Sequence, residues 1–153
     1  MFATNSMAEY GGVKIHGGRP IVVVFPLPHE VIVPASKDFV INTTVFRDVD
    51  TGLVSRVWIE TEKGGFWSDE EKLNDDFPRW QLPYLESIHD ALKKWKFEKT
   101  IRVGSHSRND SDDKLDQNVG RAYSFRFIHD ADNSLKRIQI SDNRGIIADN
   151  APE

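Results

Sequence analysis

One amphipathic pattern constrains the fold of this chain more than any other feature of its sequence. Four large apolar residues recur at spacings of 3, 4 and 3, which places them on one face of a helix. These residues are Leu85, Ile88, Leu92 and Trp95. Pro83 suits the first turn, where its missing N–H would have no intrahelical partner. The pattern predicts one principal α-helix over about residues 83–97.

Most of the remaining chain has the composition of β-strands joined by tight turns. Residues 39–47 and 53–62 are rich in Thr, Val, Ile and Phe, which fit a pleated, half-buried surface, and an Asp-rich turn ending in Gly52 separates them. A second hairpin is predicted from residues 121–129 and 135–141. The expected fold is a single α+β domain over residues 1–153, mainly antiparallel sheet built from hairpins, with the helix packed on one face.

Three segments are expected to lie outside the ordered core. Residues 1–18 are polar and glycine-bearing and predict a loose leader, and residues 104–120 are charged and aperiodic, which is typical of a mobile polar loop. Residues 145–153 end in a short polar stretch, for which a frayed tail is expected.

Composition excludes several classes of protein. The 153 residues contain no cysteine and carry a net charge of −4, which excludes disulfide scaffolds and cysteine-based metal sites. The sequence has neither an apolar run long enough to span a membrane nor the pattern of a signal peptide, so we expect a protein of the cytoplasm or another intracellular space. Nucleotide-binding and nucleophile motifs are also missing, so no cofactor is expected and catalysis is not favoured.

Charge and aromatic residues together point to an anionic partner. Residues 93–144 hold 12 basic and 8 acidic residues, and alternating aromatics on a strand flanked by arginines are typical of proteins that stack nucleic-acid bases. The candidate binding residues are Arg102, Arg108, Arg121, Tyr123, Phe125, Arg126, Lys136 and Arg137. The alternative is that the aromatic side of this strand is core and packs against the helix.

Arg56 and Trp58 form a second candidate surface. They lie two residues apart in a predicted strand and therefore on one face, and Arg and Trp are enriched at the centres of protein interfaces. This face could serve a partner protein or a homo-oligomer, although an ordinary buried tryptophan is an equal alternative.

An acidic loop gives a weaker metal candidate. Asp110, Asp112 and Asp116 could supply oxygen ligands to a hard cation, but the spacing is not that of an EF-hand. Asp110 and Asp112, with His106 or His129, would suit a metal-assisted phosphoester hydrolase. A third alternative is an interaction or inhibitor module whose acidic segment 60–76 meets a basic partner. The favoured function is a non-catalytic, macromolecule-binding module, with nucleic acid slightly ahead of other anionic partners.

Overall fold

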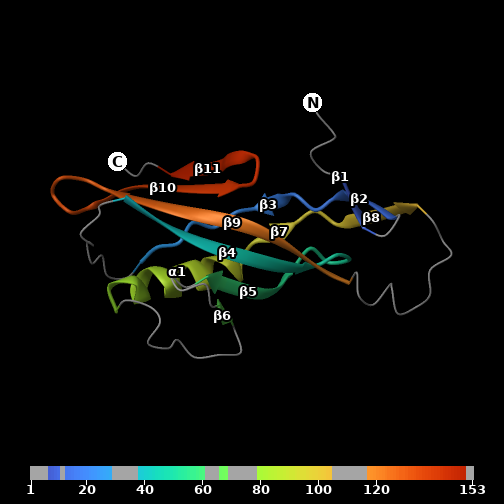
Figure 1. Cartoon of the computed structure of the whole chain (residues 1–153), viewed down its shortest axis with the longest axis horizontal. Coiled ribbons are helices and arrows are strands. Elements are labelled where there is room, and N and C mark those ends of the chain that lie inside the picture. The colour runs from blue at the N-terminus through green and yellow to red at the C-terminus, as the bar shows by residue number, and fades with distance from the viewer. Residues whose placement is uncertain are drawn as a thin grey trace.

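The computed structural model describes residues 7–10, 13–28, 38–60, 66–68, 79–104 and 117–150. This part of the chain is mainly antiparallel sheet with one α-helix, which confirms the α+β class (Figure 1). No helix among these residues is both long and apolar enough to cross a membrane.

A six-stranded antiparallel sheet forms the centre of the fold, in the order β11-β10-β9-β4-β5-β6. The strands are β4 (Asp38–Asp48), β5 (Val54–Glu60), β6 (Phe66–Ser68), β9 (Asn118–His129), β10 (Leu135–Asp142) and β11 (Gly145–Asn150). The longest pairing joins β4 to β9, with Ile41 opposite Phe125 and Val45 opposite Arg121. Strands from the two predicted hairpins are therefore neighbours at the middle of the sheet.

The turn between β4 and β5 is held by one carboxylate. Asp48 Oδ1 accepts hydrogen bonds from the backbone N–H groups of Asp50 and Thr51, at 2.9 and 3.0 Å. Its other oxygen accepts from Gln117 Nε2 at 2.9 Å. These hydrogen bonds favour the charged carboxylate and lower the pKa of Asp48 below its usual value. The bond from Gln117 contributes most, followed by the bonds from the turn.

The helix is shorter than the apolar pattern predicts. After a 3₁₀ turn (Arg79–Gln81), α1 spans Leu82–Leu92, and the expected continuation to residue 97 is wrong. The last turn tightens, because Trp95 N–H bonds the carbonyl of Leu92 rather than that of Ala91. The chain then enters β7 (Lys96–Phe97), where Phe97 N–H donates to Gly52 O at 2.9 Å. Trp95 is still 1% exposed, so its predicted burial is confirmed although it lies outside the helix.

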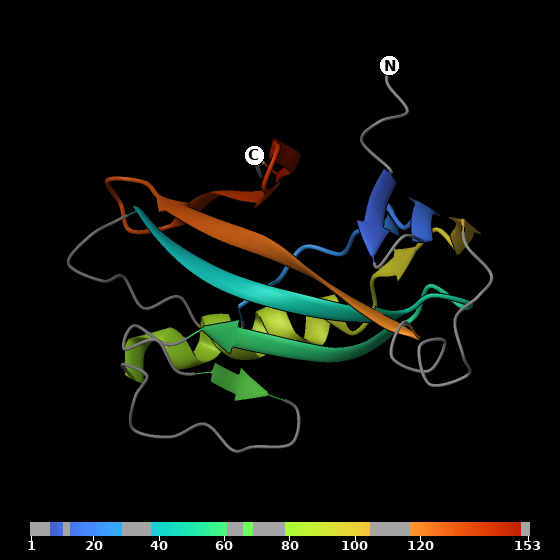
Figure 2. The same ribbon diagram turned by 45° about the vertical axis from the view of Figure 1, so that its right-hand side comes forward.

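A second layer covers one face of the sheet. It consists of α1 and, beside it, β7 paired with β3 (Pro20–Val22), and both figures show the helix along β4 and β5 (Figure 2). The indole N–H of Trp95 bonds the carbonyl of Val24 at 2.9 Å and so connects the two parts of this layer. The core between the layers contains Tyr84, Leu85, Ile88 and Leu92 from the helix and Val57, Ile59, Tyr123, Phe125, Phe127, Ile138 and Ile140 from the sheet.

Three segments expected to be loose contain β-structure. In the predicted leader, β1 (Met7–Tyr10) pairs with β2 (Val13–Gly17), and β2 pairs with β8 (Thr100–Gly104). Figures 1 and 2 place this small sheet at the end of the molecule away from α1. In the predicted tail, residues 145–150 form β11 and pair with β10. Of the predicted polar loop 104–120, residues 105–116 lie outside the described part and β9 begins at Asn118.

Candidate functional site

The aromatic side of β9 faces the core, not a partner. Tyr123, Phe125 and Phe127 share one face as predicted, but they are only 1%, 0% and 0% exposed. The ring of Trp95 lies 5.2 Å from that of Tyr123 and 6.2 Å from that of Phe125. Base stacking needs an exposed ring face, so the expectation that Tyr123 and Phe125 contact a nucleic acid is corrected: the helix layer requires them as core.

The opposite side of the sheet is open to solvent. We call open face the surface formed by Asn42, Thr44, Phe46, Arg56, Trp58, Ala122, Ser124 and Arg126, which are exposed or half-buried. Arg56 and Trp58 lie together on it, as predicted, while the intervening Val57 is 0% exposed on the core side. Trp58 packs edge-on against Phe46 with ring centroids 4.9 Å apart. Part of the indole surface of Trp58 is therefore already in contact with Phe46 within the sheet.

Three of the predicted phosphate-binding residues already face carboxylates. Arg126 Nε lies 2.9 Å from Asp38 Oδ1, and Arg137 Nε lies 3.4 Å from Asp149 Oδ1. Lys136 Nζ is 3.9 Å from Asp130 Oδ1. These pairs are largely exposed, so each stabilises the fold only weakly, but together they balance the positive charge of this region. Two further predicted cations, Arg108 and the side chain of Arg102, lie outside the described residues.

The alternative metal site falls mainly outside the described residues as well. Asp110, Asp112, Asp116 and His106 all belong to the segment 105–116, which the structure does not describe. His129 is 6% exposed, and its Nε2 shares a hydrogen bond of 2.8 Å with the hydroxyl of Tyr84. Elsewhere in the described ranges, no three His, Asp or Glu side chains come together as metal ligands.

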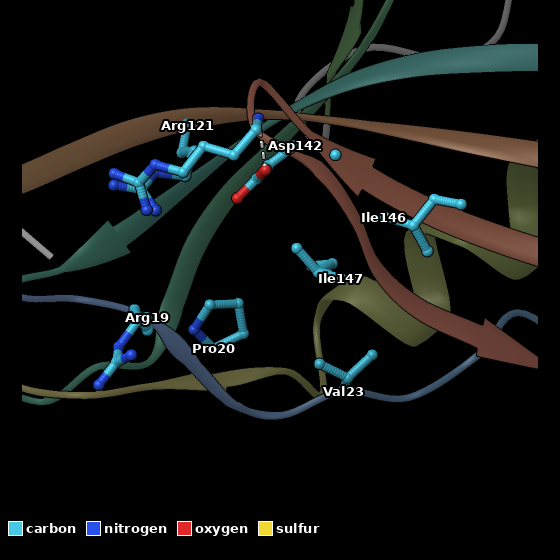
Figure 3. Close-up of a pocket in the computed structure, with 9 residues that line it drawn as sticks. Arg19, Pro20, Val23, Arg121, Asp142, Ile146 and Ile147 are labelled. Atoms are coloured by element: carbon cyan, nitrogen blue, oxygen red, sulfur yellow. Dashed lines mark hydrogen bonds between the residues drawn. The ribbon is translucent and has the colours of Figure 1, made fainter. Parts of the chain in front are cut away.

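A pocket of about 300 Å³ that the sequence did not reveal lies between β3 and the β10–β11 hairpin. Three arginines line it, one from each of three distant segments: Arg19 before β3, Arg121 in β9 and Arg144 in the hairpin turn. The other lining residues are Pro20, Val23, Asp142, Gly145, Ile146 and Ile147. Figure 3 shows Arg19 and Arg121 at one end of this pocket, which we call the arginine pocket, and Ile146 at the other.

The charges around the arginine pocket are partly balanced from within the protein. Asp142 Oδ1 accepts a hydrogen bond from the backbone N–H of Arg144 at 2.8 Å, the dashed line of Figure 3. Arg19 Nε lies 3.4 Å from Glu98 Oε1. Three arginines against Asp142 leave a lining charge of +2, and counting Glu98 leaves +1. The pocket is therefore positive although the chain as a whole is negative.

Tyr123 is a core residue whose hydroxyl is affected by the charges of two residues that line the pocket, Arg121 and Asp142. Its burial raises the pKa of the hydroxyl, while the cations of Arg121 and Arg47 act in the opposite direction. Arg121 lies two residues before Tyr123 in β9 and thus on the same face. Of the residues predicted to bind a partner, Arg121 is the one that the structure brings into this pocket.

The arginine pocket combines three cationic side chains with an apolar wall. Arginine guanidinium groups bind carboxylates and phosphates with paired hydrogen bonds, and the aliphatic residues offer contact to an apolar group beside the charge. Arg19 lies about a hundred residues or more before Arg121 and Arg144, so no local sequence pattern could have indicated the pocket. Comparison of the chain with protein-family models, curated proteins and solved structures finds no match.

Proposed function

We propose that this protein is a single-domain binding module that docks an anionic macromolecular partner at the arginine pocket. The observation that carries the proposal is the convergence of Arg19, Arg121 and Arg144 around one concave, partly apolar surface of a negatively charged protein. On an acidic protein, a local positive site determines where an anionic partner binds, because the rest of the surface repels an anion.

The geometry changes the expected mode of binding. The preference for nucleic acid depended on Tyr123 and Phe125 stacking on bases, and both rings are buried. No aromatic side chain is found among the lining residues of the arginine pocket. The proposal therefore keeps the anionic partner and Arg121, and it replaces the basic and aromatic sheet face by the pocket beside β11.

A titration with two polyanions tests the proposal. Fluorescently labelled poly-glutamate and a labelled single-stranded oligonucleotide are each mixed with the protein at low and moderate salt, and binding is followed by anisotropy. We expect at least one of them to bind with an affinity that falls as salt rises. Arg121→Ala should weaken that binding by about tenfold, the loss of one charge-assisted hydrogen bond.

Arg126→Ala provides the matched control, because Arg126 lies on the same strand but on the open face. It should leave the affinity within about twofold, as for a distant surface charge. Binding of neither polyanion, or an equal loss in the two variants, would refute the arginine pocket as the site.

A further inference from the structure

Strand β11 forms one edge of the six-stranded sheet. It spans Gly145–Asn150 and pairs only with β10 among the described strands. In an antiparallel edge strand, alternate residues direct their N–H and C=O groups away from the sheet, where they can pair with another backbone. Ile146 and Ile147 are 58% and 39% exposed on this strand. Proteins usually protect such an edge with charge, proline or a covering segment. The first half of β11 is instead exposed and apolar at Ile146 and Ile147, and the one charged residue of the strand, Asp149, pairs with Arg137 of β10.

The arginine pocket lies directly along this edge. Gly145, Ile146 and Ile147 of β11 form one wall, and Pro20 of β3 with the neighbouring Val23 forms the other. Figure 3 shows the side chains of Ile147, Pro20 and Val23 facing the space between the two strands. Its volume of about 300 Å³ is at the lower end for ligand pockets, so it suits one or two side chains rather than a folded element.

We propose that the partner is an extended acidic peptide segment that adds to the edge of β11 as a further strand. This inference rests on the proposed function and identifies the class of its partner. The peptide backbone would pair with the outward N–H and C=O groups of β11, which gives affinity, while its side chains enter the arginine pocket, which gives specificity. A polynucleotide has no backbone that matches this alternating pattern of donors and acceptors.

The lining residues specify which peptide side chains fit. Arg19 and Arg121 lie together at one end of the pocket and Ile146 at the other. Side chains that enter from one face of an added strand are two residues apart, about 7 Å along the strand. The expected motif is therefore an Asp or Glu followed or preceded, after one intervening residue, by an aliphatic residue. The carboxylate accepts hydrogen bonds from Arg121, and the aliphatic residue contacts Ile146.

A set of three synthetic peptides tests the inference by fluorescence anisotropy. The first, called the Glu–Val peptide, repeats Glu-Ser-Val-Ser, which puts Glu and Val on one face of a strand. The second, called the Lys–Val peptide, repeats Lys-Ser-Val-Ser. The third is the Glu–Val peptide N-methylated at alternate residues, made in both registers, which removes backbone donors and keeps every charge. We expect the Glu–Val peptide to bind, the Lys–Val peptide to fail, and N-methylation on the pairing side to weaken binding by about tenfold or more. Equal binding of the N-methylated peptides in both registers would overturn strand addition.

Amide hydrogen exchange locates the bound peptide. Protection should increase in residues 145–150 on addition of the Glu–Val peptide, and it should not change in β5, which is separated from β11 by three strands. Protection confined to β5 or to the open face would overturn the site. Arg121→Ala should reduce peptide affinity about tenfold, and Arg126→Ala should not.

The two proposals fail in distinguishable ways. If an oligonucleotide binds and depends on Arg121 while the Glu–Val peptide does not bind, the anion site stands and the peptide inference is wrong. If poly-glutamate and the oligonucleotide both fail to bind, the proposed function is wrong and the peptide inference falls with it.

Discussion

Tyr84, in the first turn of α1, places a polar group against the sheet. Its hydroxyl shares a hydrogen bond of 2.8 Å with His129 Nε2, and its ring is 0% exposed. Burial disfavours the phenolate, which raises the pKa of Tyr84 to about 12. The pKa of Tyr84 is therefore higher in the folded protein than in the unfolded chain. The protonated hydroxyl contributes its full stabilisation below pH ~10, and this stabilisation is lost as the pH rises from ~10 toward the pKa of the folded protein.

Tyr84→Phe should therefore make the alkaline loss of stability shallower. Between pH 8 and 11 the wild-type free energy of unfolding should fall by roughly 1 kcal/mol through Tyr84 alone, and the variant should lack this part. Urea unfolding at both pH values measures the difference. Phe39→Leu is the control, because Phe39 packs edge-on against Tyr84 at 5.0 Å and carries no ionisable group; it should lower stability and keep the wild-type slope. Parallel pH slopes for Tyr84→Phe and the wild type would show that Tyr84 ionises as easily in the folded state.

At the scale of elements, the turn after β4 sets the position of β7. Gly52 has a φ of +73°, a conformation that residues with a Cβ rarely adopt, and a Cβ there would overlap the carbonyl oxygen of Phe97. The carbonyl of Gly52 in turn accepts the hydrogen bond from Phe97 N–H. The hairpin turn and the end of the helix layer thus depend on the same glycine.

Gly52→Ala should cost roughly 3 kcal/mol of unfolding free energy, since backbone strain and the overlap with Phe97 act together. Gly145→Ala is the matched control. Gly145 also has a positive φ, +136°, but no atom lies within 4 Å of a Cβ placed on it. Strain alone should then cost about 1–2 kcal/mol. Thermal and denaturant unfolding of the two variants gives the comparison, and an equal loss would mean that the contact with Phe97 does not constrain the turn.

The hairpins were predictable because their signals are local, whereas the end of the helix was not. Asp48 and Gly52 lie within one turn and hold it with bonds between near neighbours. The helix ends after Leu92 because Phe97 pairs with Gly52, a contact across 45 residues of chain. Trp95 misled the prediction, because its spacing fits a helical face while its actual burial comes from the turn that follows the helix.

At the scale of the whole molecule, the packing of the helix layer on the sheet determines which side chains are accessible to a partner. The alternation along β9 was predicted correctly, but a period-2 pattern does not say which face the helix will cover. Charge composition gave no indication of the arginine pocket, because Arg19, Arg121 and Arg144 meet only when β3 and the β10–β11 hairpin flank the same space. Ile146 and Ile147 belong to the segment for which a frayed tail is expected, and they form an edge strand instead: both side chains are exposed, so the sequence shows no alternation of buried and exposed residues there.

Among the described residues the helix layer covers the core side of β9 and leaves the open face exposed. Substitutions at adjacent positions of β9 should therefore lower the stability by very different amounts. Phe125 is 0% exposed between the sheet and Trp95, so Phe125→Ala should lower the free energy of unfolding by about 3–5 kcal/mol. Ser124, its neighbour on the open face, bonds Asn42 Oδ1 at 2.7 Å in an exposed pair. Ser124→Ala should therefore cost less than about 1 kcal/mol.

Urea denaturation measures the stability of both variants. If Phe125→Ala does not fold, Phe125→Leu, which keeps most of the apolar volume, is measured in its place. Phe125→Leu should cost less than about 1.5 kcal/mol if the site can repack. If Ser124→Ala were as damaging as Phe125→Ala, both faces of the sheet would be covered in solution, and the open face would not exist. If Phe125→Ala were harmless, the ring would not be core, and β9 could present its aromatic side to a partner.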